Sequence, residues 1–283
     1  MINFTKKIMK FTFYRYNIDY GQEIQNKQQF LNDGLIIDSK IAKNEKAFKF
    51  INIENDTNYI YGEMVKYDPR YEEDVLNEET GKTEKEELNN RIEVRNLFLI
   101  DFKNSVIALE NTSIGKNNRL NIFKELFEDN QKIKERAVII SLHEINRSYE
   151  FYKEIKEFVK VNEVKIKLKP SNPRFNDRWK DVDEDLRNRN VTEYNEKQVN
   201  QNDEGIEVNE SMEKKIYMTE DGYGSSEAKG VDSDNQQRTI TTKDTNRAVT
   251  KDVQKNSING FVDLKDKLSN TFTYIVNRIL NNE

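Results

Sequence analysis

Strand-forming residues dominate the first hundred positions of the chain, and this feature most restricts its fold. Residues 8–18 are largely β-branched and aromatic, with no Gly or Pro among them, which suits a pleated surface. Residues 48–53 and 59–65 form two further runs, and the Asn- and Asp-rich segment between them favours a tight connection. Residues 94–109 read as another hairpin. The pattern predicts an N-terminal antiparallel β-meander.

An acid-rich segment, residues 68–91, interrupts these strands. It holds one Pro and one Gly and few apolar side chains, so it buries too little apolar area to offset its ordering entropy. We expect a mobile loop or a charged hairpin tip, with a functional lid as the alternative.

The middle of the chain alternates between helical and strand patterns. Apolar residues recur at helical spacing in 118–128, and a short apolar strand is expected at 137–142. Ser148 is placed to cap a helix that carries Phe151, Ile155, Phe158 and Val159 on one face. A strand at 164–168 follows.

The last hundred residues combine a charged helix, two strands and an amphipathic helix. We expect the charged helix at 177–198 and the strands at 214–219 and 238–242. Residues 258–280 carry a long apolar stripe, which can pack on the core or on a second copy of the protein.

These patterns predict an α+β fold with an N-terminal antiparallel β-meander, an α/β middle region and a C-terminal amphipathic helix. We expect one domain over residues 1–130, including the charged segment 68–91, and a second over residues 131–283. The length of 283 residues fits one large or two small domains.

Composition excludes several classes of site. The chain has no Cys and one His, which rules out disulfides, thiolate zinc sites and a thiol nucleophile. Neither a signal peptide nor an apolar run of about 18 residues is visible, so we expect a cytoplasmic protein without a membrane span. No cofactor and no resident metal are expected.

Charge is distributed in blocks. Residues 131–180 hold 13 basic and 7 acidic side chains, residues 181–236 hold 6 and 16, and residues 237–283 hold 8 and 5. The two basic blocks can form an anion-binding face, with the acidic block either solvated or folded against them.

Three motifs are candidates for catalysis. His143 precedes Glu144 and can be a general base or a structural residue, but Arg147 stands where a zinc-protease helix needs a second His. Gly222-Tyr223-Gly224 lacks the third Gly of a dinucleotide loop and reads as a turn. Glu163-Val164-Lys165 and Glu227-Ala228-Lys229 match the E-x-K element of metal-dependent nucleases. We assign no catalytic residue.

A basic strand is the favoured phosphate contact. Three lysines alternate along one strand face, and further cations follow closely. The candidate nucleic-acid-binding residues are Lys165, Lys167, Lys169, Arg174, Arg178 and Lys180. The alternative is a sheet edge that lysines protect against aggregation.

A resemblance to known proteins rests on three consecutive elements. They are the strand ending in Lys167-Leu168-Lys169-Pro170, the charged helix after Pro173, and the strand running into Asp221-Gly222-Tyr223-Gly224. The layout resembles an uncharacterised bacterial family found among phage-defence genes and, more remotely, is similar to the phage lambda Rex exclusion protein A. The resemblance covers residues 160–245 in motif. It implies a self-associating sensor or effector of abortive infection that binds nucleic acid, although the helix after Pro173 is acidic here.

We therefore expect a non-enzymatic antiviral protein of abortive infection or phage exclusion that senses or binds DNA or RNA. It would self-associate through residues 258–280 or act with a partner protein encoded nearby. The alternatives are a metal-dependent nuclease effector and a protein–protein interaction module that uses the acidic stretch 181–236.

Overall fold

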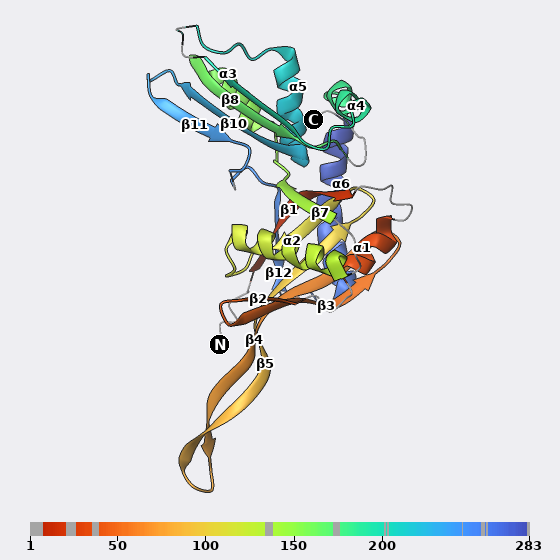
Figure 1. The fold of residues 1–283 in the computed structure, drawn as a ribbon, viewed down its shortest axis with the longest axis vertical. Helices are drawn as coiled ribbons and strands as arrows, with labels where there is room; N and C mark the ends of the chain where they lie inside the picture. Colours follow the sequence, from red (N-terminus) through yellow and green to blue (C-terminus); the bar gives the residue numbers. More distant parts are fainter. Residues whose placement is uncertain are drawn as a thin grey trace.

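A computed structural model describes residues 8–20, 27–35, 40–133, 138–171, 176–200, 202, 204–244, 246–255, 258 and 260–281. It confirms the predicted α+β class. Two antiparallel sheets lie one above the other, and a long two-stranded ribbon extends from the lower one (Figure 1). None of the described helices has the length and apolarity that crossing a bilayer requires.

The first sheet has eight strands and contains the predicted meander. Its order is β12-β1-β6-β5-β4-β3-β2, and β7 pairs with β1 beside β12. The strands are β1 (Ile8–Tyr20), β2 (Ile41–Lys43), β3 (Lys46–Asn55), β4 (Tyr59–Asn77), β5 (Lys82–Asp101), β6 (Val106–Glu110), β7 (Val138–Glu144) and β12 (Thr250–Gln254).

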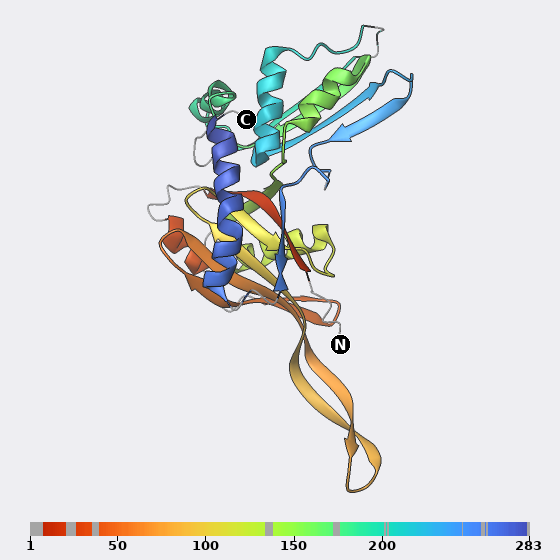
Figure 2. The same cartoon turned by 180° about the vertical axis from the view of Figure 1, so that it is seen from behind.

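Helices cover both faces of this sheet. On one face lie α1 (Lys27–Leu35) and α2 (Lys116–Ile133), where the rings of Phe50, Phe98 and Phe123 meet with centroids 5.1–5.6 Å apart. The other face receives α6 (Phe261–Asn281), seen in front of the sheet in Figure 2. The apolar stripe of α6 is buried against the sheet, so the chain itself occupies the surface that could have joined a second copy.

The second sheet has the order β11-β10-β8-β9. Its strands are β8 (Lys160–Leu168), β9 (Tyr194–Val199), β10 (Gly224–Val231) and β11 (Gln237–Thr241). One core joins it to α3 (Glu150–Glu157), α4 (Lys180–Asn188) and α5 (Glu210–Met218). In Figure 1, α2 lies in front and α3 and α5 lie behind the strands of the second sheet; in Figure 2 the two helices are in front of the strands. The open face of this sheet is therefore on the same side of the molecule as α2.

Two secondary-structure predictions are wrong. The helix expected at 177–198 ends at Asn188, and the rest of that segment forms β9, which pairs with β8. The strand expected at 214–219 is part of α5 instead. Met212 and Ile216 are buried four residues apart, and the Asn209 side chain accepts a hydrogen bond from the Met212 N–H. The window 214–219 is too short to show the helical repeat of apolar residues.

The predicted cap of α3 is also wrong. The Ser148 hydroxyl donates to the Glu150 carboxylate and makes no cap bond. The carboxylate of Glu220 instead accepts the Phe151 and Tyr152 N–H groups, at 2.9 and 3.4 Å. A residue about 70 positions away therefore satisfies the free N–H groups at the start of this helix.

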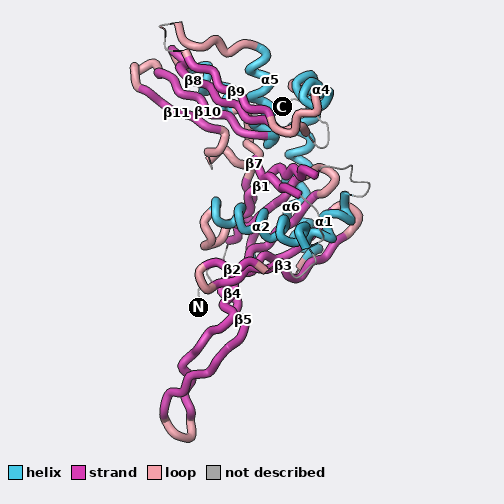
Figure 3. The backbone as a smooth tube through the Cα atoms, in the orientation of Figure 1, coloured by secondary structure: helices cyan, strands magenta, loops and turns pink. Residues whose placement is uncertain are grey.

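The charged segment 68–91 is ordered as the outer part of β4 and β5, which matches the hairpin expectation. We call residues 68–92 the arm; its two strands leave the body together and end in a loop (Figure 3). The two sheets do not separate at residue 130, because β7, β12 and α6 all return to the first sheet.

A buried polar cluster joins the two sheets at a π-helical turn, η1 (Thr219–Tyr223). The carboxylate of Asp221 is fully buried and accepts hydrogen bonds from Trp179 at 2.8 Å and Asn176 at 3.1 Å. Arg278, from α6, lies 2.8 Å from the same carboxylate. The cluster therefore links α6, packed on the first sheet, to the core of the second.

Candidate functional site

A cleft of about 900 Å³ opens where the two sheets meet. It lies between the N-terminal half of α2, the end of β7, and the residues at the start of β10 and just after β11. Its walls are largely polar and cationic. They are formed by Tyr14, Gly115, Lys116, Asn117, Asn118, Leu120, Asn121, Lys124, Leu142, His143, Glu144, Gly224, Thr242 and Lys243. We call this cavity, together with the neighbouring Lys169, the cationic cleft.

Three lysines of the cationic cleft have no carboxylate partner among the described residues. Within the described part of the chain, no carboxylate lies at ion-pair distance from Lys124, Lys169 or Lys243. Burial lowers the pKa of Lys124, and the charges of Lys169 and Lys243 lower it further, against the effect of Glu128. Glu193 acts on Lys169 and Glu128 acts on Lys124, but neither forms an ion pair with these lysines among the described residues. Positive charges outnumber negative ones here, which is unfavourable, so this arrangement favours binding of an anion.

His143 lies among these lysines on β7. Its Nε2 atom is buried and has no hydrogen-bond partner among the described residues. Burial, followed by the charges of Lys169, Lys124 and Lys243, lowers the pKa of His143 to about 3, so the imidazole is neutral at pH 7. Glu144 does not orient this ring: its carboxylate lies 2.6 Å from Lys116 Nζ. The general-base hypothesis therefore lacks its supporting carboxylate.

The N-terminus of α2 adds a further positive element. Gly115, Lys116, Asn117 and Asn118 line the cleft at the start of this 18-residue helix. The first N–H groups of a helix have no acceptor within the helix, and the helix dipole favours negative charge there. The backbone N–H groups at the start of α2 and the cationic side chains of this helix thus both attract an anion.

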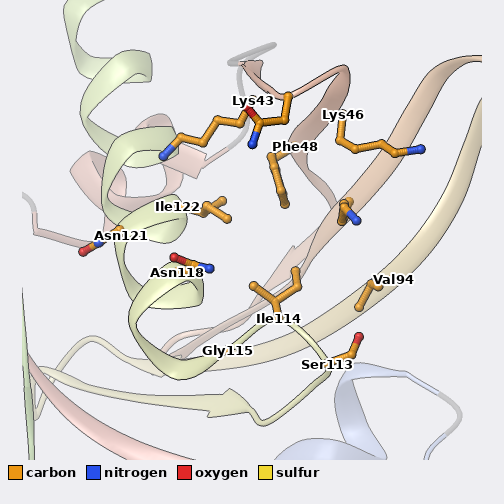
Figure 4. A pocket seen from close by; sticks show the side chains of 12 residues that line it. Lys43, Lys46, Phe48, Val94, Ser113, Ile114, Gly115, Asn118, Asn121 and Ile122 are labelled. Atoms are coloured by element: carbon orange, nitrogen blue, oxygen red, sulfur yellow. The ribbon is translucent and has the colours of Figure 1, made fainter.

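A second cavity, of about 600 Å³, adjoins the cleft along α2 and shares Gly115, Asn118 and Asn121 with it. Phe48, Ile114 and Ile122 give it an apolar lining, with Lys43 and Lys46 at its rim (Figure 4). These lysines are already paired. Lys43 contacts Glu125 at 2.7 Å, and Lys46 contacts Asp68 and Glu93 at 2.7 and 2.6 Å. The second cavity is therefore less suited to a polyanion.

The six sequence-predicted basic residues do not form one patch. Lys169 belongs to the cationic cleft, and Lys167 is exposed on the adjoining open face of the second sheet. Arg178 stacks over the rings of Tyr149 and Tyr217, at 4.9 and 5.2 Å. Lys180 is exposed at the start of α4, and Arg174 lies outside the described residues.

Lys165, the remaining residue of that set, belongs to an ion-pair network formed by the two E-x-K elements. These elements lie side by side, with Glu227 opposite Lys165 and Lys229 opposite Glu163. Lys165 contacts both carboxylates at 3.0 Å. Hydrogen bonds from Lys165, Lys197 and Lys229 lower the pKa of Glu163 to about 2. The described residues contain no group of three or more His, Asp or Glu that could hold a metal ion.

The acidic stretch 181–236 is folded into the second sheet and its helices rather than solvated as one surface. Asp183 is buried and binds Ser171 and Arg187, while Glu196 contacts Lys215 at 2.6 Å. Glu220 and Asp221 are fully buried. Much of its negative charge is therefore neutralised within the chain.

Sequence reasoning missed Lys124 and Lys243 as site residues. Lys124 lies within a helix predicted from its apolar residues alone, and Lys243 follows a strand more than a hundred positions later. The positive charge of residues 237–283 was the available signal for Lys243. No local pattern marks Lys124.

Comparison with known proteins identifies one family. The family model described as a domain of unknown function, DUF4747, matches residues 9–269. No curated protein matches the chain.

Proposed function

The chain belongs to the DUF4747 family of domains of unknown function, and we propose that it binds nucleic acid through the cationic cleft and the open face beside it. The observation that carries this proposal is the group of three lysines around the neutral His143, for which the described part of the chain provides no ion-pair partner. Such a group is stabilised by a ligand that brings several negative charges close together. A phosphate backbone has this property.

The open face of the second sheet extends the positive surface. Lys165, Lys167, Lys197 and Lys229 outnumber Glu163, Glu193 and Glu227 there, which leaves a net charge of +1 on this group. A strand of nucleic acid can run from this face into the cleft, since both lie on the side of α2 (Figure 1). These are contacts to phosphates, so we expect binding with little sequence preference.

The test is fluorescence anisotropy with single- and double-stranded DNA and RNA across a salt series. Each phosphate contact releases counterions, so the affinity should fall steeply as salt rises. The triple variant Lys124→Gln, Lys169→Gln, Lys243→Gln should bind at least about 30-fold more weakly, with the salt slope reduced by about 3.

The matched control removes three exposed lysines elsewhere, by Lys251→Gln, Lys255→Gln and Lys267→Gln. This variant has the same net charge and should retain nearly all of the affinity. Equal losses in both variants would show that only total charge matters and would contradict the assigned cleft.

The same assay separates the two alternatives. Degradation of the probe that requires Mg²⁺ and stops in Glu163→Gln or Glu227→Gln would support the nuclease alternative. Absence of binding at low salt, with co-purification of a basic protein, would support the interaction module.

For the biological role we keep phage exclusion as the hypothesis, on the resemblance described above. Cells that express the protein with its neighbouring genes should plate phage less efficiently than cells without them. If nucleic-acid binding triggers the response, the triple cleft variant should plate phage like the empty strain, and protection by that variant would separate the two activities.

A further inference from the structure

The arm carries the entire net charge of the protein. Residues 68–92 contain nine acidic and four basic side chains, a net charge of −5, which equals that of the whole chain. All other residues together are therefore neutral. The negative charge is concentrated on the part of the molecule that lies farthest from the second sheet (Figures 1 and 2).

Acidic side chains face each other across the arm. Glu72 lies directly opposite Glu87, and Glu73 lies opposite Glu86. Like charges in such cross-strand positions destabilise a ribbon. Lys85 contacts Glu72 at 2.9 Å and offsets part of this repulsion. The arrangement is stabilised further when cations from another surface approach the ribbon.

The arm has no strand partner from the rest of the protein among the described residues, and at its base Lys46 contacts Asp68 at 2.7 Å. Pairing of β4 with β3 ends at Tyr67, and pairing of β5 with β6 begins only at Phe98. Both outer edges of the ribbon therefore carry backbone groups without a strand partner among the described residues. A two-stranded ribbon alone is marginally stable in water. Val75, Leu76, Leu88 and Ile92 are exposed on it, at 36–60%.

We propose that the arm of one molecule docks in the cationic cleft of a second copy of this chain. The acidic clusters at 72–74 and 84–87 complement Lys124, Lys169 and Lys243, which have no carboxylate partner within the described chain. The inference deepens the proposed function because it uses the same cleft, but it depends only on the charge of that cleft. Nucleic acid and the arm then compete for one surface.

The geometry favours a contact between molecules over one within a molecule. Both views of the fold show the arm running away from α2 and from the second sheet (Figures 1 and 2). The cleft is lined by residues of α2, β7 and the start of β10, so the arm points away from it. The ten arm residues of β4, 68–77, span about 33 Å at the usual rise per residue of a strand. That length brings the acidic segment clear of its own first sheet and exposes it to a neighbour.

Sedimentation velocity on the full chain and on two charge-reversal variants tests whether the arm docks in the cleft of a second copy. One variant reverses the arm (Glu72→Lys, Glu73→Lys, Glu86→Lys, Glu87→Lys), and the other reverses the cleft (Lys124→Glu, Lys169→Glu, Lys243→Glu). The wild type should self-associate at low salt and dissociate at about 0.5 M salt, where surface charges are screened. Each variant alone should be monomeric, and their equimolar mixture should associate with an affinity within tenfold of the wild type.

Three results would overturn the proposal: a monomeric wild type at low salt, an arm-reversed variant that still self-associates, or a mixture that stays monomeric. A monomeric wild type whose arm captures a basic protein would assign the arm to a different partner and also overturn it. Thermal melts of each variant confirm that it is folded.

Nucleic-acid binding is measured separately on the same variants, so the two proposals can fail independently. The arm-reversed variant should bind the single-stranded DNA or RNA probe at least as tightly as the wild type, because its cleft is intact and no longer occupied. Addition of that probe to the wild type should dissociate the self-associated form, and persistence of the associated form at saturating probe would show that the arm does not use the cleft.

Discussion

At the scale of single residues, the same side-chain types have different roles according to their neighbours. Lys165 and Lys169 lie four positions apart on a predicted phosphate-binding strand. Lys165 contacts two carboxylates, whereas Lys169 contacts none of those in the described segments. His143 is held neutral by burial and by three cations. Strand register places Glu227 opposite Lys165. The cations around His143 come instead from α2, the end of β8 and the residues after β11.

The pH dependence of the free energy of unfolding should reveal the lowered pKa of His143. Its pKa is about 3 in the folded protein and about 6.5 in an unfolded chain. The unfolded state therefore binds the proton first, and the stability that His143 contributes is lost as pH falls from about 6.5 towards 3. The loss should approach about 1.4 kcal/mol per pH unit within that window. Urea denaturation of the wild type and of His143→Gln at a series of pH values measures the difference.

Nuclear magnetic resonance measures the pKa of His143 directly, because His143 is the single histidine of the chain. Its ring signals should stay constant between about pH 5 and 8 in the free protein. Saturation with a single-stranded DNA or RNA probe should raise its pKa, since phosphates offset the charges of the surrounding lysines. A free-protein pKa close to 6.5 would contradict the buried environment described here.

At the scale of elements, turns and caps are determined by distant partners. The η1 turn presents Glu220 to the start of α3 and Asp221 to Trp179, and it does so through Gly222 in the left-handed region, at φ 88°. A β-carbon at Gly222 would lie 2.6 Å from the Arg15 β-carbon on β1. The turn therefore requires glycine both for its backbone and for its close approach to the first sheet.

Gly222→Ala should destabilise the protein by about 2 kcal/mol or more, from backbone strain combined with the clash against β1. The matched control is Gly115→Ala, where a β-carbon meets no atom within 4 Å. The control should change the free energy of unfolding by no more than about 0.5 kcal/mol. Chemical denaturation measures both variants, and equal effects would refute the close packing of η1 on β1.

At the scale of the whole molecule, one helix links the two sheets. The stripe of α6 packs on the first sheet through Leu264, Leu268 and Phe272. Near its C-terminal end, Arg278 pairs with Asp221, and both side chains are at least 97% buried. Removal of one partner leaves a buried charge without its counterion, which is costly.

Arg278→Met and Asp221→Asn should each lower the free energy of unfolding by about 3–5 kcal/mol. The double variant should lose at least about 1 kcal/mol less than the sum, because the pair is in direct contact. A double-mutant cycle by urea denaturation tests this, with Arg189 and Asp185, an exposed pair on α4, as the control that shows no measurable coupling. Additive losses at Arg278 and Asp221 would mean that the two sheets are not coupled through this contact.

Local pattern alone determined the N-terminal meander, the hairpins, the helix at α2 and the amphipathic α6, because strand and helix periods are properties of neighbouring residues. Tertiary structure decided the remainder. Residues 214–219 joined a helix because Met212 and Ile216 are buried against the second sheet, and segment 68–91 became a ribbon by continuing a hairpin whose base is in the core.

The candidate site was only partly visible in the sequence. Lys167 and Lys169 could be named from one strand, but the cationic cleft also needs Lys124, His143 and Lys243, which come from three other parts of the chain. Of the two carboxylates that neutralise Lys165, Glu163 lies on the same strand and Glu227 is placed by strand register. Charge and residue type are encoded locally, whereas the distance between charges, which determines what they bind, depends on the path of the chain between the two sheets.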